Sequence, residues 1–172
     1  MSTRERILDA ALDLFAEEGI GGTTVTEIER RAGLTPGRGS LYRHFKSKDD
    51  VFEATIVREV ERLKADLVEE RAQLPRLPDR RSQLTLDYHQ CLRAVQRFDA
   101  LLRVLAREHG RVTKVHDILG RVLAIDDRVD SLTSAVVVSA LLGYHHASQF
   151  QRRPFHNIDP DTFITKLVDL TL

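Results

Sequence analysis

The sequence predicts an all-α protein, with an N-terminal three-helix helix-turn-helix domain followed by a C-terminal helical domain. Apolar residues recur every three or four positions through most of the chain, which is the spacing of one face of a helix. Ser, Thr or Asp precedes several of these segments, and Gly or Pro follows several of them, as at helix ends. With 172 residues, 42% of them hydrophobic, the chain is large enough for one or two small domains.

The first helix is expected over residues 3–18. Its apolar side chains form one continuous stripe at helical spacing, made of Ile7, Leu8, Ala11, Leu12 and Phe15. Gly19 is expected to end this helix, and the next two glycines to form the turn that follows. We expect the helix to pack behind the residues that come next in the chain.

A second helix is expected to begin at residue 24 or 25. Thr23 or Thr24 can cap it through a side-chain oxygen, and Val25, Ile28 and Ala32 fall on one face. Gly33 ends the helix, because glycine adopts the left-handed conformation at little cost.

A third helix is expected directly after this turn. Thr35 and Pro36 give a cap and a first-turn proline, and Leu41 and Phe45, four residues apart, point back to the core. Two helices joined by a glycine-containing turn, the second with polar side chains outward, form a helix-turn-helix. Its second helix enters the major groove of DNA.

Charge is distributed unevenly along the chain. The formal net charge is zero, so no overall positive field indicates a nucleic-acid partner. The segment from residue 30 to residue 48, however, contains no acid and six basic residues, which are Arg30, Arg31, Arg38, Arg43, Lys46 and Lys48. A basic surface confined to one segment is what contact with DNA phosphates requires.

A long helix is expected from residue 47 to about residue 73. Ser47 and Asp50 have the spacing of a capping box, and apolar residues then recur every three or four positions from Phe52 to Leu67. The following residues, 74–80, contain two prolines and are expected to be a linker.

The rest of the chain is also expected to be helical. Helices are predicted over residues 82–96, 98–109, 112–126, 131–150 and 160–170, with a break at Gly110. Asp130 and Asp159 stand at capping positions for the last two. The β-branched residues 136–138 would also suit a buried strand, but their small neighbours favour close helix packing.

The N-terminal third of the chain resembles the DNA-binding domain of the tetracycline-repressor (TetR) family. The resemblance rests on RILDAALDLFAEEG, TTVTEIERRAGLT and SLYRHFKSK, which occur together and in this order. Two departures stand out: Glu29 replaces the usual alanine, and residues 36–39 make the approach to the recognition helix about two residues longer.

The resemblance implies which side chains contact DNA. Thr24, Thr35, Tyr42 and Lys48 correspond to phosphate contacts, and Arg38, Ser40 and His44 are candidates for contacts with bases or nearby phosphates. Arg38 is the best candidate for direct base recognition, because arginine can donate two parallel hydrogen bonds to guanine. Which residues between 35 and 40 face the bases is left open by the longer approach.

The resemblance also implies the organisation of the whole chain. Residues 1–47 would bind a palindromic DNA operator, and residues 48–172 would form a dimerisation and ligand-binding domain. The last two helices of two copies would pair as a four-helix bundle. Residues that would line a modest effector pocket are Tyr88, His89, Cys91, Leu92, Phe98, Arg103, His116, Tyr144, His145 and Phe150. We expect a ligand-responsive repressor.

Other functions are less well supported by the sequence. The adjacent His145 and His146 point about 100° apart on a helix, so we expect no metal site and no cofactor. We expect no enzyme, since Cys91 has no acid partner or oxyanion donor in view. One cysteine and no membrane-spanning or signal segment suit a cytoplasmic protein. Three alternatives remain: an activator or global DNA binder, a protein-interaction module, and a Cys91-dependent enzyme.

Overall fold

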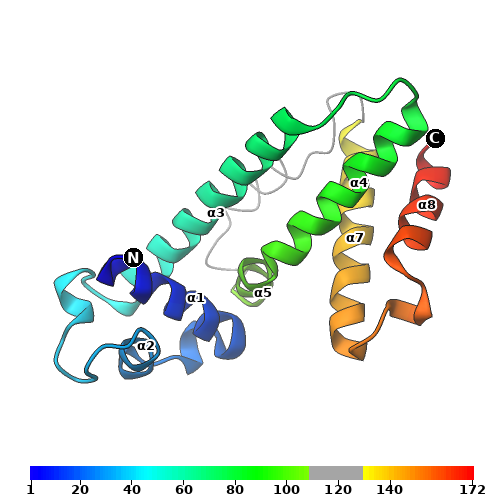
Figure 1. Cartoon of the computed structure of the whole chain (residues 1–172). Helices are drawn as coiled ribbons and strands as arrows, with labels where there is room; N and C mark the ends of the chain where they lie inside the picture. The colour runs from blue at the N-terminus through cyan, green and yellow to red at the C-terminus, as the bar shows by residue number, and fades with distance from the viewer. Residues whose placement is uncertain (109–129) are drawn as a thin grey trace. The chain divides into compact units, whose positions relative to one another are not determined.

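A computed structural model describes residues 1–108 and 130–172 of the chain (Figure 1), and these residues form helices and connecting loops without a strand. The helices are α1 (Thr3–Gly22), α2 (Val25–Arg31), η1 (Leu41–Arg43), α3 (Lys48–Gln73), α4 (Arg80–Arg97), α5 (Asp99–Arg107), α7 (Ser131–Gln151), η2 (Phe155–Asn157) and α8 (Pro160–Thr171). The all-α prediction is confirmed. The helix predicted over residues 112–126, the break at Gly110 and the ligand candidate His116 lie outside the described residues.

The described residues fall into two compact units. Residues 1–63 and 98–108 form unit 1, and residues 64–97 and 130–172 form unit 2. The functional boundary between residues 47 and 48 stays a prediction, and the contacts divide the chain at other residues. The first part of α3 and all of α5 pack with the N-terminal helices instead.

Unit 1 is organised around α1. The apolar stripe of this helix is buried, and the ring of Phe15 meets the ring of Phe52 on α3 edge to face, with 5.5 Å between centroids. Gly19 breaks the helical path with φ 75° and ψ 168°, so the expected end of the helix at this residue is confirmed. A short helical stretch continues to Gly22, and the backbone then turns into α2.

A charged cluster ties α1 to α3. The guanidinium of Arg58 lies 3.1 Å from the carboxylate of Glu5, 2.8 Å from that of Asp9 and 2.7 Å from that of Glu59. Its Nε donates a hydrogen bond of 2.8 Å to the carboxylate of Glu59, whereas its Nη2 lies close to Asp9 and Glu59 without forming a hydrogen bond, so the contact with Asp9 is mainly electrostatic. Glu59 is buried, and Arg62 adds a second cation to it at 3.1 Å.

The end of α5 docks at the break in α1. Arg107 donates a hydrogen bond of 2.8 Å to the carbonyl of Glu17, and Glu108 accepts one of 3.0 Å from the backbone N–H of Ile20. A Cβ on Gly19 would lie 3.0 Å from the side chain of Arg107. Glycine therefore permits both the turn in α1 and the close approach of α5.

Unit 2 is built from α4, α7 and α8, which lie side by side in Figure 1. Their buried side chains form one core, which consists of Leu84, Tyr88, Cys91, Leu92, Val137, Leu141, Tyr144, Ile164, Leu167 and Val168. Tyr144 stacks on Phe163 with 4.4 Å between ring centroids, and its hydroxyl donates to the carbonyl of Ile158. The residues 136–138, which would also have suited a strand, lie within α7.

The caps follow the sequence signals closely. Asp130 accepts hydrogen bonds from the N–H groups of Leu132 and Thr133 at the start of α7, and Asp159 accepts one from Thr162 at the start of α8. Ser47 accepts from the N–H of Asp50, but the Asp50 carboxylate accepts from Lys46 rather than from Ser47 itself. One half of the predicted capping box is therefore present, and the other is shifted by one residue.

Candidate nucleic-acid interface

The helix α2 starts with a complete capping box. Thr24 accepts a hydrogen bond from the N–H of Glu27, and the Glu27 carboxylate accepts from the N–H of Thr24 at 2.8 Å. The Thr24 hydroxyl also donates to this carboxylate at 2.6 Å, and these bonds lower the pKa of Glu27. The Thr24 side chain is exposed but committed to this cap, and its phosphate contact stays a prediction.

The predicted second helix of the motif is wrong in this structure. Between the end of α2 and the start of α3, the chain forms a loop and one short 3-10 turn, η1. The reason lies in the backbone: Gly37 has φ 75° and Gly39 has φ 67°, both in the left-handed region that a right-handed helix cannot pass through. The expected cap and first-turn proline at residues 35 and 36 are followed by a turn instead.

The carboxylate of Glu29 supports this loop from inside. Glu29 is only 1% exposed, and its Oε2 accepts a hydrogen bond of 2.8 Å from the N–H of Gly37. Its Oε1 accepts one of 3.1 Å from the N–H of Leu41. From the sequence alone, Glu29 stands out only as an unusual residue. The signal for its role was a carboxylate beside the buried Ile28, followed by a loop with two glycines.

Two apolar side chains fasten the loop to unit 1. Leu41 is 0% exposed and Phe45 is 4% exposed, as predicted. The guanidinium of Arg4 lies 5.1 Å from the centre of the Phe45 ring, at the distance of a cation–π contact. The turn η1 thus keeps the two core contacts that the predicted helix was expected to make.

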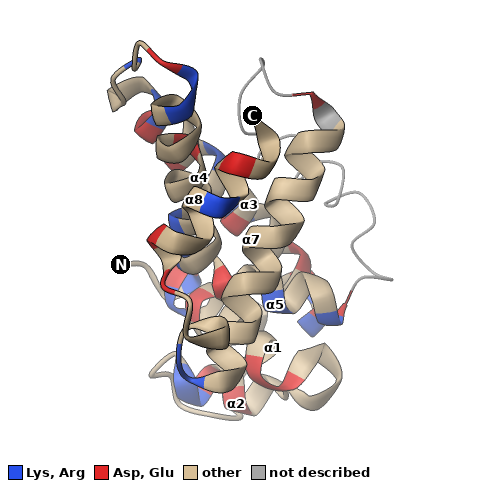
Figure 2. Cartoon of the chain, turned by 90° about the vertical axis from the view of Figure 1, so that its right-hand side faces the viewer, with Lys and Arg blue, Asp and Glu red and all other residues tan. Residues whose placement is uncertain are grey.

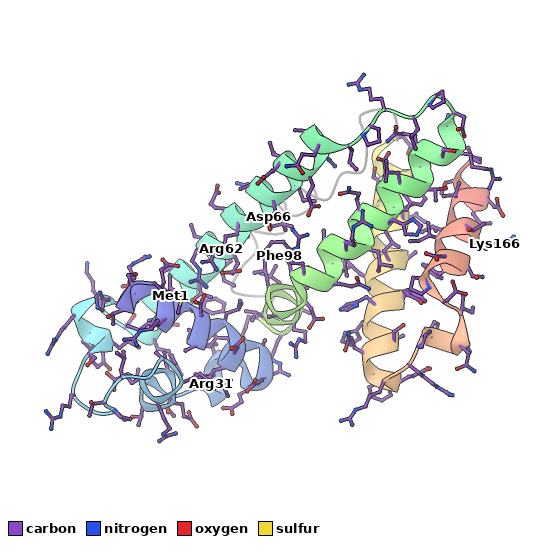
Figure 3. The ribbon with its side chains drawn as sticks, viewed as in Figure 1. Met1, Arg31, Arg62, Asp66, Phe98 and Lys166 are labelled. Atoms are coloured by element: carbon purple, nitrogen blue, oxygen red, sulfur yellow. The ribbon has the colours of Figure 1, made fainter. Side chains whose placement is uncertain are left out.

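The structure brings most of the predicted DNA contacts to the exposed side of this loop. On this loop, Thr35, Arg38, Tyr42 and His44 are exposed, and Ser40 is half-buried. Arg43 and Lys46 are also exposed and add positive charge to the same segment. Arg31, labelled in Figure 3, is instead paired with Glu17 at 3.0 Å.

Lys48 has an internal role that the sequence did not reveal. Its ammonium donates hydrogen bonds to the carbonyls of Ile20 and Thr23, at 2.6 Å and 2.7 Å. These carbonyls lie in the last turn of α1 and at its C-cap, so Lys48 connects the end of α1 to the start of α3. An ammonium has three N–H groups, which leaves one for a phosphate. The phosphate contact of Lys48 stays a prediction.

The predicted ligand contacts in the described residues are divided between the two units. Tyr88, Cys91, Leu92 and Tyr144 belong to the packed core of unit 2, and His145 is buried as well. Phe150 is 88% exposed. Phe98 and Arg103 belong to unit 1, where Phe98 is buried and Arg103 pairs with Asp99 at 2.9 Å. Each of these ligand contacts stays a prediction.

His89 lies in a groove between α4 and α8. Its ring accepts or donates a hydrogen bond of 2.9 Å with Asp161. The groove has a volume of about 520 Å³ and is lined by Arg81, Ser82, Thr85, Leu86, His89, Arg93 and Thr165. Arg81 also pairs with Asp169 at 2.7 Å. Six of the seven lining residues have a polar side chain, and three of these six are Arg or His.

The surroundings of Cys91 do not suit a nucleophile. Burial raises the pKa of its thiol to about 12, so the reactive thiolate is scarce at neutral pH. In the part of the chain that the structure describes, no three His, Cys, Asp or Glu side chains are grouped as metal ligands. Within the same residues, no helix combines the length and the apolar character needed to cross a membrane.

Comparison with known proteins gives a consistent result for the N-terminal segment. Residues 7–55 match the model for bacterial regulatory proteins of the tetR family. The regulator AcrR of Shigella flexneri is 50% identical over 50 residues, which are 29% of this chain and 22% of AcrR. The repressor BepR of Brucella suis is 48% identical over 56 residues, 33% of this chain and 26% of BepR. The chain thus matches about a quarter of the length of these curated relatives.

Solved structures resemble nearly the whole chain. A TetR-like transcriptional regulator from Rhodococcus sp. RHA1 aligns with 98% of this chain and 93% of its own, with a TM-score of 0.68 and 26% identity. The likeness therefore extends through the helices of both units.

Proposed function

Through residues 7–55, the chain belongs to the tetR family of bacterial regulatory proteins, and we propose that it is a sequence-specific transcriptional repressor. In this proposal it binds a palindromic DNA operator as a homodimer, and a small-molecule effector lowers its affinity for the operator. The curated relatives are named as transcriptional regulators, and BepR is named as a repressor. A repressor of this kind blocks polymerase by occupying the DNA.

The observation that carries the proposal is the exposed surface of residues 35–46. Basic and hydrogen-bonding side chains project from this segment, while Leu41 and Phe45 anchor its other side in the core. DNA recognition needs this combination, because donors must be presented at fixed positions to be matched to base edges and phosphates. We assign Thr24, Thr35, Tyr42 and Lys48 to phosphates, and Arg38, Ser40 and His44 to the groove.

The homodimer is supported by the character of α7. This helix contains no Lys, Arg, Asp or Glu along its whole length, and its ribbon in Figure 2 is accordingly tan, without blue or red segments. Three large apolar side chains on it are exposed: Leu132 (73%), Val136 (55%) and Phe150 (88%). Ser139, Gly143 and His146 complete an exposed stripe with spacings of four, three, four, three and four residues. This repeat is typical of a helix that packs lengthwise on another helix.

The stripe also fits a two-fold partner. If two copies of α7 cross antiparallel at residue 141, Leu132 meets Phe150, Val136 meets His146, and Ser139 meets Gly143 of the other copy. The small pair lies nearest the centre, where it would let the backbones approach, and the space over Gly143 is open. Asp130 and Arg152 are also equally far from residue 141, so Asp130 of each copy would meet Arg152 of the other, which carries the opposite charge. A two-fold interface requires such self-complementarity.

The effector is proposed from the family likeness, and unit 2 offers one site with matching chemistry. Arg81, His89 and Arg93 line the groove between α4 and α8, so it could bind a molecule that carries an anionic group. An effector must bind the DNA-incompetent state more tightly to act. Candidate anions should therefore raise the melting temperature of the protein and reduce operator binding together.

The experiment that tests the proposal is selection of bound DNA fragments by the purified protein, followed by affinity measurements at several salt concentrations. Enrichment of one palindrome, with affinity falling as salt rises, is expected because phosphate contacts release counterions. Two protein chains should bind each palindrome. If no sequence is enriched and binding shows no salt dependence, the chain is not a DNA-binding regulator and a protein-interaction role is favoured.

A further inference from the structure

The two unusual features of the DNA-binding segment meet at one side chain. Glu29 stands at a position where an apolar residue was expected, and residues 36–39 make the following loop longer. In the structure, the carboxylate of Glu29 accepts the N–H groups of Gly37 and Leu41, at 2.8 Å and 3.1 Å. The buried carboxylate and the longer loop are therefore directly connected by hydrogen bonds.

We propose that Glu29 is a positioning residue for DNA recognition, whose carboxylate holds the loop of residues 36–40 in the conformation that selects the bases. The part of this proposal that concerns DNA rests on the proposed function. The part that concerns the loop rests on the geometry of the free protein alone. Glu29 itself is buried and does not reach the DNA surface.

The carboxylate acts at both ends of the loop. Gly37 lies at its start and Leu41 at its end, and one oxygen of Glu29 is bound to each. Arg38 lies between these two fixed amides, flanked by Gly37 and Gly39. Two glycines would otherwise leave this stretch free to adopt many conformations. The hydrogen bonds to Glu29 restrict the backbone on both sides of Arg38 and so define where its guanidinium is presented.

Only a carboxylate is suited to this position. Both of its oxygens accept hydrogen bonds, whereas an amide of the same shape has one acceptor and one donor group. In Glu29→Gln, the NH₂ group would face the N–H of either Gly37 or Leu41, and one of the two hydrogen bonds would be lost. A buried carboxylate also needs such partners, because a charge without hydrogen bonds is strongly disfavoured away from water.

The first test measures the loop in the absence of DNA. We expect amide hydrogen exchange at Gly37 to be slow, although this residue is exposed, because its N–H is bound to Glu29. In Glu29→Gln, exchange at Gly37 or Leu41 should become roughly tenfold or more faster, as expected for loss of a hydrogen bond to a charged group. Exchange in α1 should be unchanged, which shows that the unit remains folded.

The matched control is Glu27→Gln, which alters another carboxylate on α2. The capping box between residues 24 and 27 can form with Gln as well as with Glu. The amides of Gly37 and Leu41 should therefore exchange as fast as in the unaltered protein. Exchange at Gly37 in the unaltered protein at the rate of an unstructured peptide would overturn the proposal. This measurement needs no variant, so it applies even if Glu29→Gln fails to fold.

The second test repeats the DNA selection with Glu29→Gln. We expect about a tenfold loss of preference at the bases nearest Arg38, with the salt dependence unchanged because the phosphate contacts remain. A general loss of folding would reduce binding to all sequences alike. An unchanged base preference would overturn the role of Glu29 in recognition. If the unaltered protein selects no sequence, the proposed function fails, and the exchange experiment still decides whether Glu29 holds the loop.

Discussion

At the scale of single residues, two side chains stabilise the structure at positions where a DNA contact was expected. Lys48 binds two carbonyls at the end of α1, and Thr24 caps α2. Arg38 differs from both, because it is exposed and lies between glycines on a loop. A substitution at Arg38 should therefore affect DNA binding without affecting folding.

Arg38→Ala should relax base preference while leaving affinity for random DNA almost unchanged. A pair of hydrogen bonds from arginine to guanine contributes about 1–3 kcal/mol of discrimination, so the preference should fall by roughly tenfold to a hundredfold. Binding of selected and random fragments by fluorescence anisotropy would measure this. Tyr42→Ala should weaken both classes equally. Equal losses on both classes for Arg38→Ala would contradict base recognition by this residue.

Cys91 should make folding stability sensitive to alkaline pH. The folded-state pKa of about 12 lies above the ordinary value of 9.0, so the folded protein holds this proton more tightly than the unfolded chain. The contribution is constant below pH 9 and is lost as pH rises from about 9 to 12. Urea denaturation at pH 8 and pH 10 should show a larger loss for the unaltered protein than for Cys91→Ala. Equal losses would contradict a buried, protonated thiol.

At the scale of elements, the sequence predicted most helices because their signals are local. The caps at Thr24, Asp130 and Asp159 and the break at Gly19 each depend on a few neighbouring residues. The third helix of the motif was not predictable in this way. Its cap signals at residues 35 and 36 compete with a carboxylate from α2, and only the folded structure brings that carboxylate to the loop.

The docking of α5 on α1 was also beyond the sequence pattern. Periodicity identified α5 as a helix but could not assign it to the N-terminal unit, since Arg107 and Glu17 are ninety residues apart. The candidate DNA contacts lie close together in the sequence, so they could be assigned to one segment. The hydrogen bonds of Lys48 to residues more than twenty positions away could not be predicted, for the same reason. Contacts between distant residues depend on packing geometry, which spacing along the chain does not describe.

The charged cluster between α1 and α3 should contribute substantially to the stability of unit 1. Arg58→Ala would leave the buried Glu59 with only the more exposed Arg62 beside it, and we expect a loss of about 3 kcal/mol in the free energy of unfolding. Arg62→Ala, at a side chain 47% exposed, should lose less than about 1 kcal/mol. Chemical denaturation of both variants would test this. Equal effects would mean that burial of Arg58 does not govern the cluster.

At the scale of the whole molecule, the proposed function depends on a second copy. One short recognition segment contacts too little DNA for tight binding, and a palindrome requires two-fold symmetry. The exposed stripe of α7 is the surface that we assign to this pairing. The last helix, α8, uses Ile164, Leu167 and Val168 in the internal core of unit 2 and exposes mainly polar side chains.

Phe150→Asp should separate the dimer, because it places a charge in the apolar stripe near the partner's Leu132. Loss of a buried aromatic side chain and burial of a carboxylate should raise the dimer dissociation constant by about a hundredfold or more. Sedimentation equilibrium would measure the change. Val68→Asp, at a side chain 70% exposed on α3, is the control and should remain dimeric. A dimer that survives Phe150→Asp would place the interface elsewhere.

The loop that replaces the third helix has a consequence for how new specificities can arise. Within a helix, each replacement must also preserve helix propensity, so the residues that read DNA are constrained by the fold. Here the conformation depends on Glu29, on two glycines and on the anchors Leu41 and Phe45. Residues 38 and 40 are left outside these constraints. Libraries varied at these two positions should therefore yield folded proteins with altered operator preferences. The DNA specificity could then be changed while the residues that determine the loop conformation stay the same.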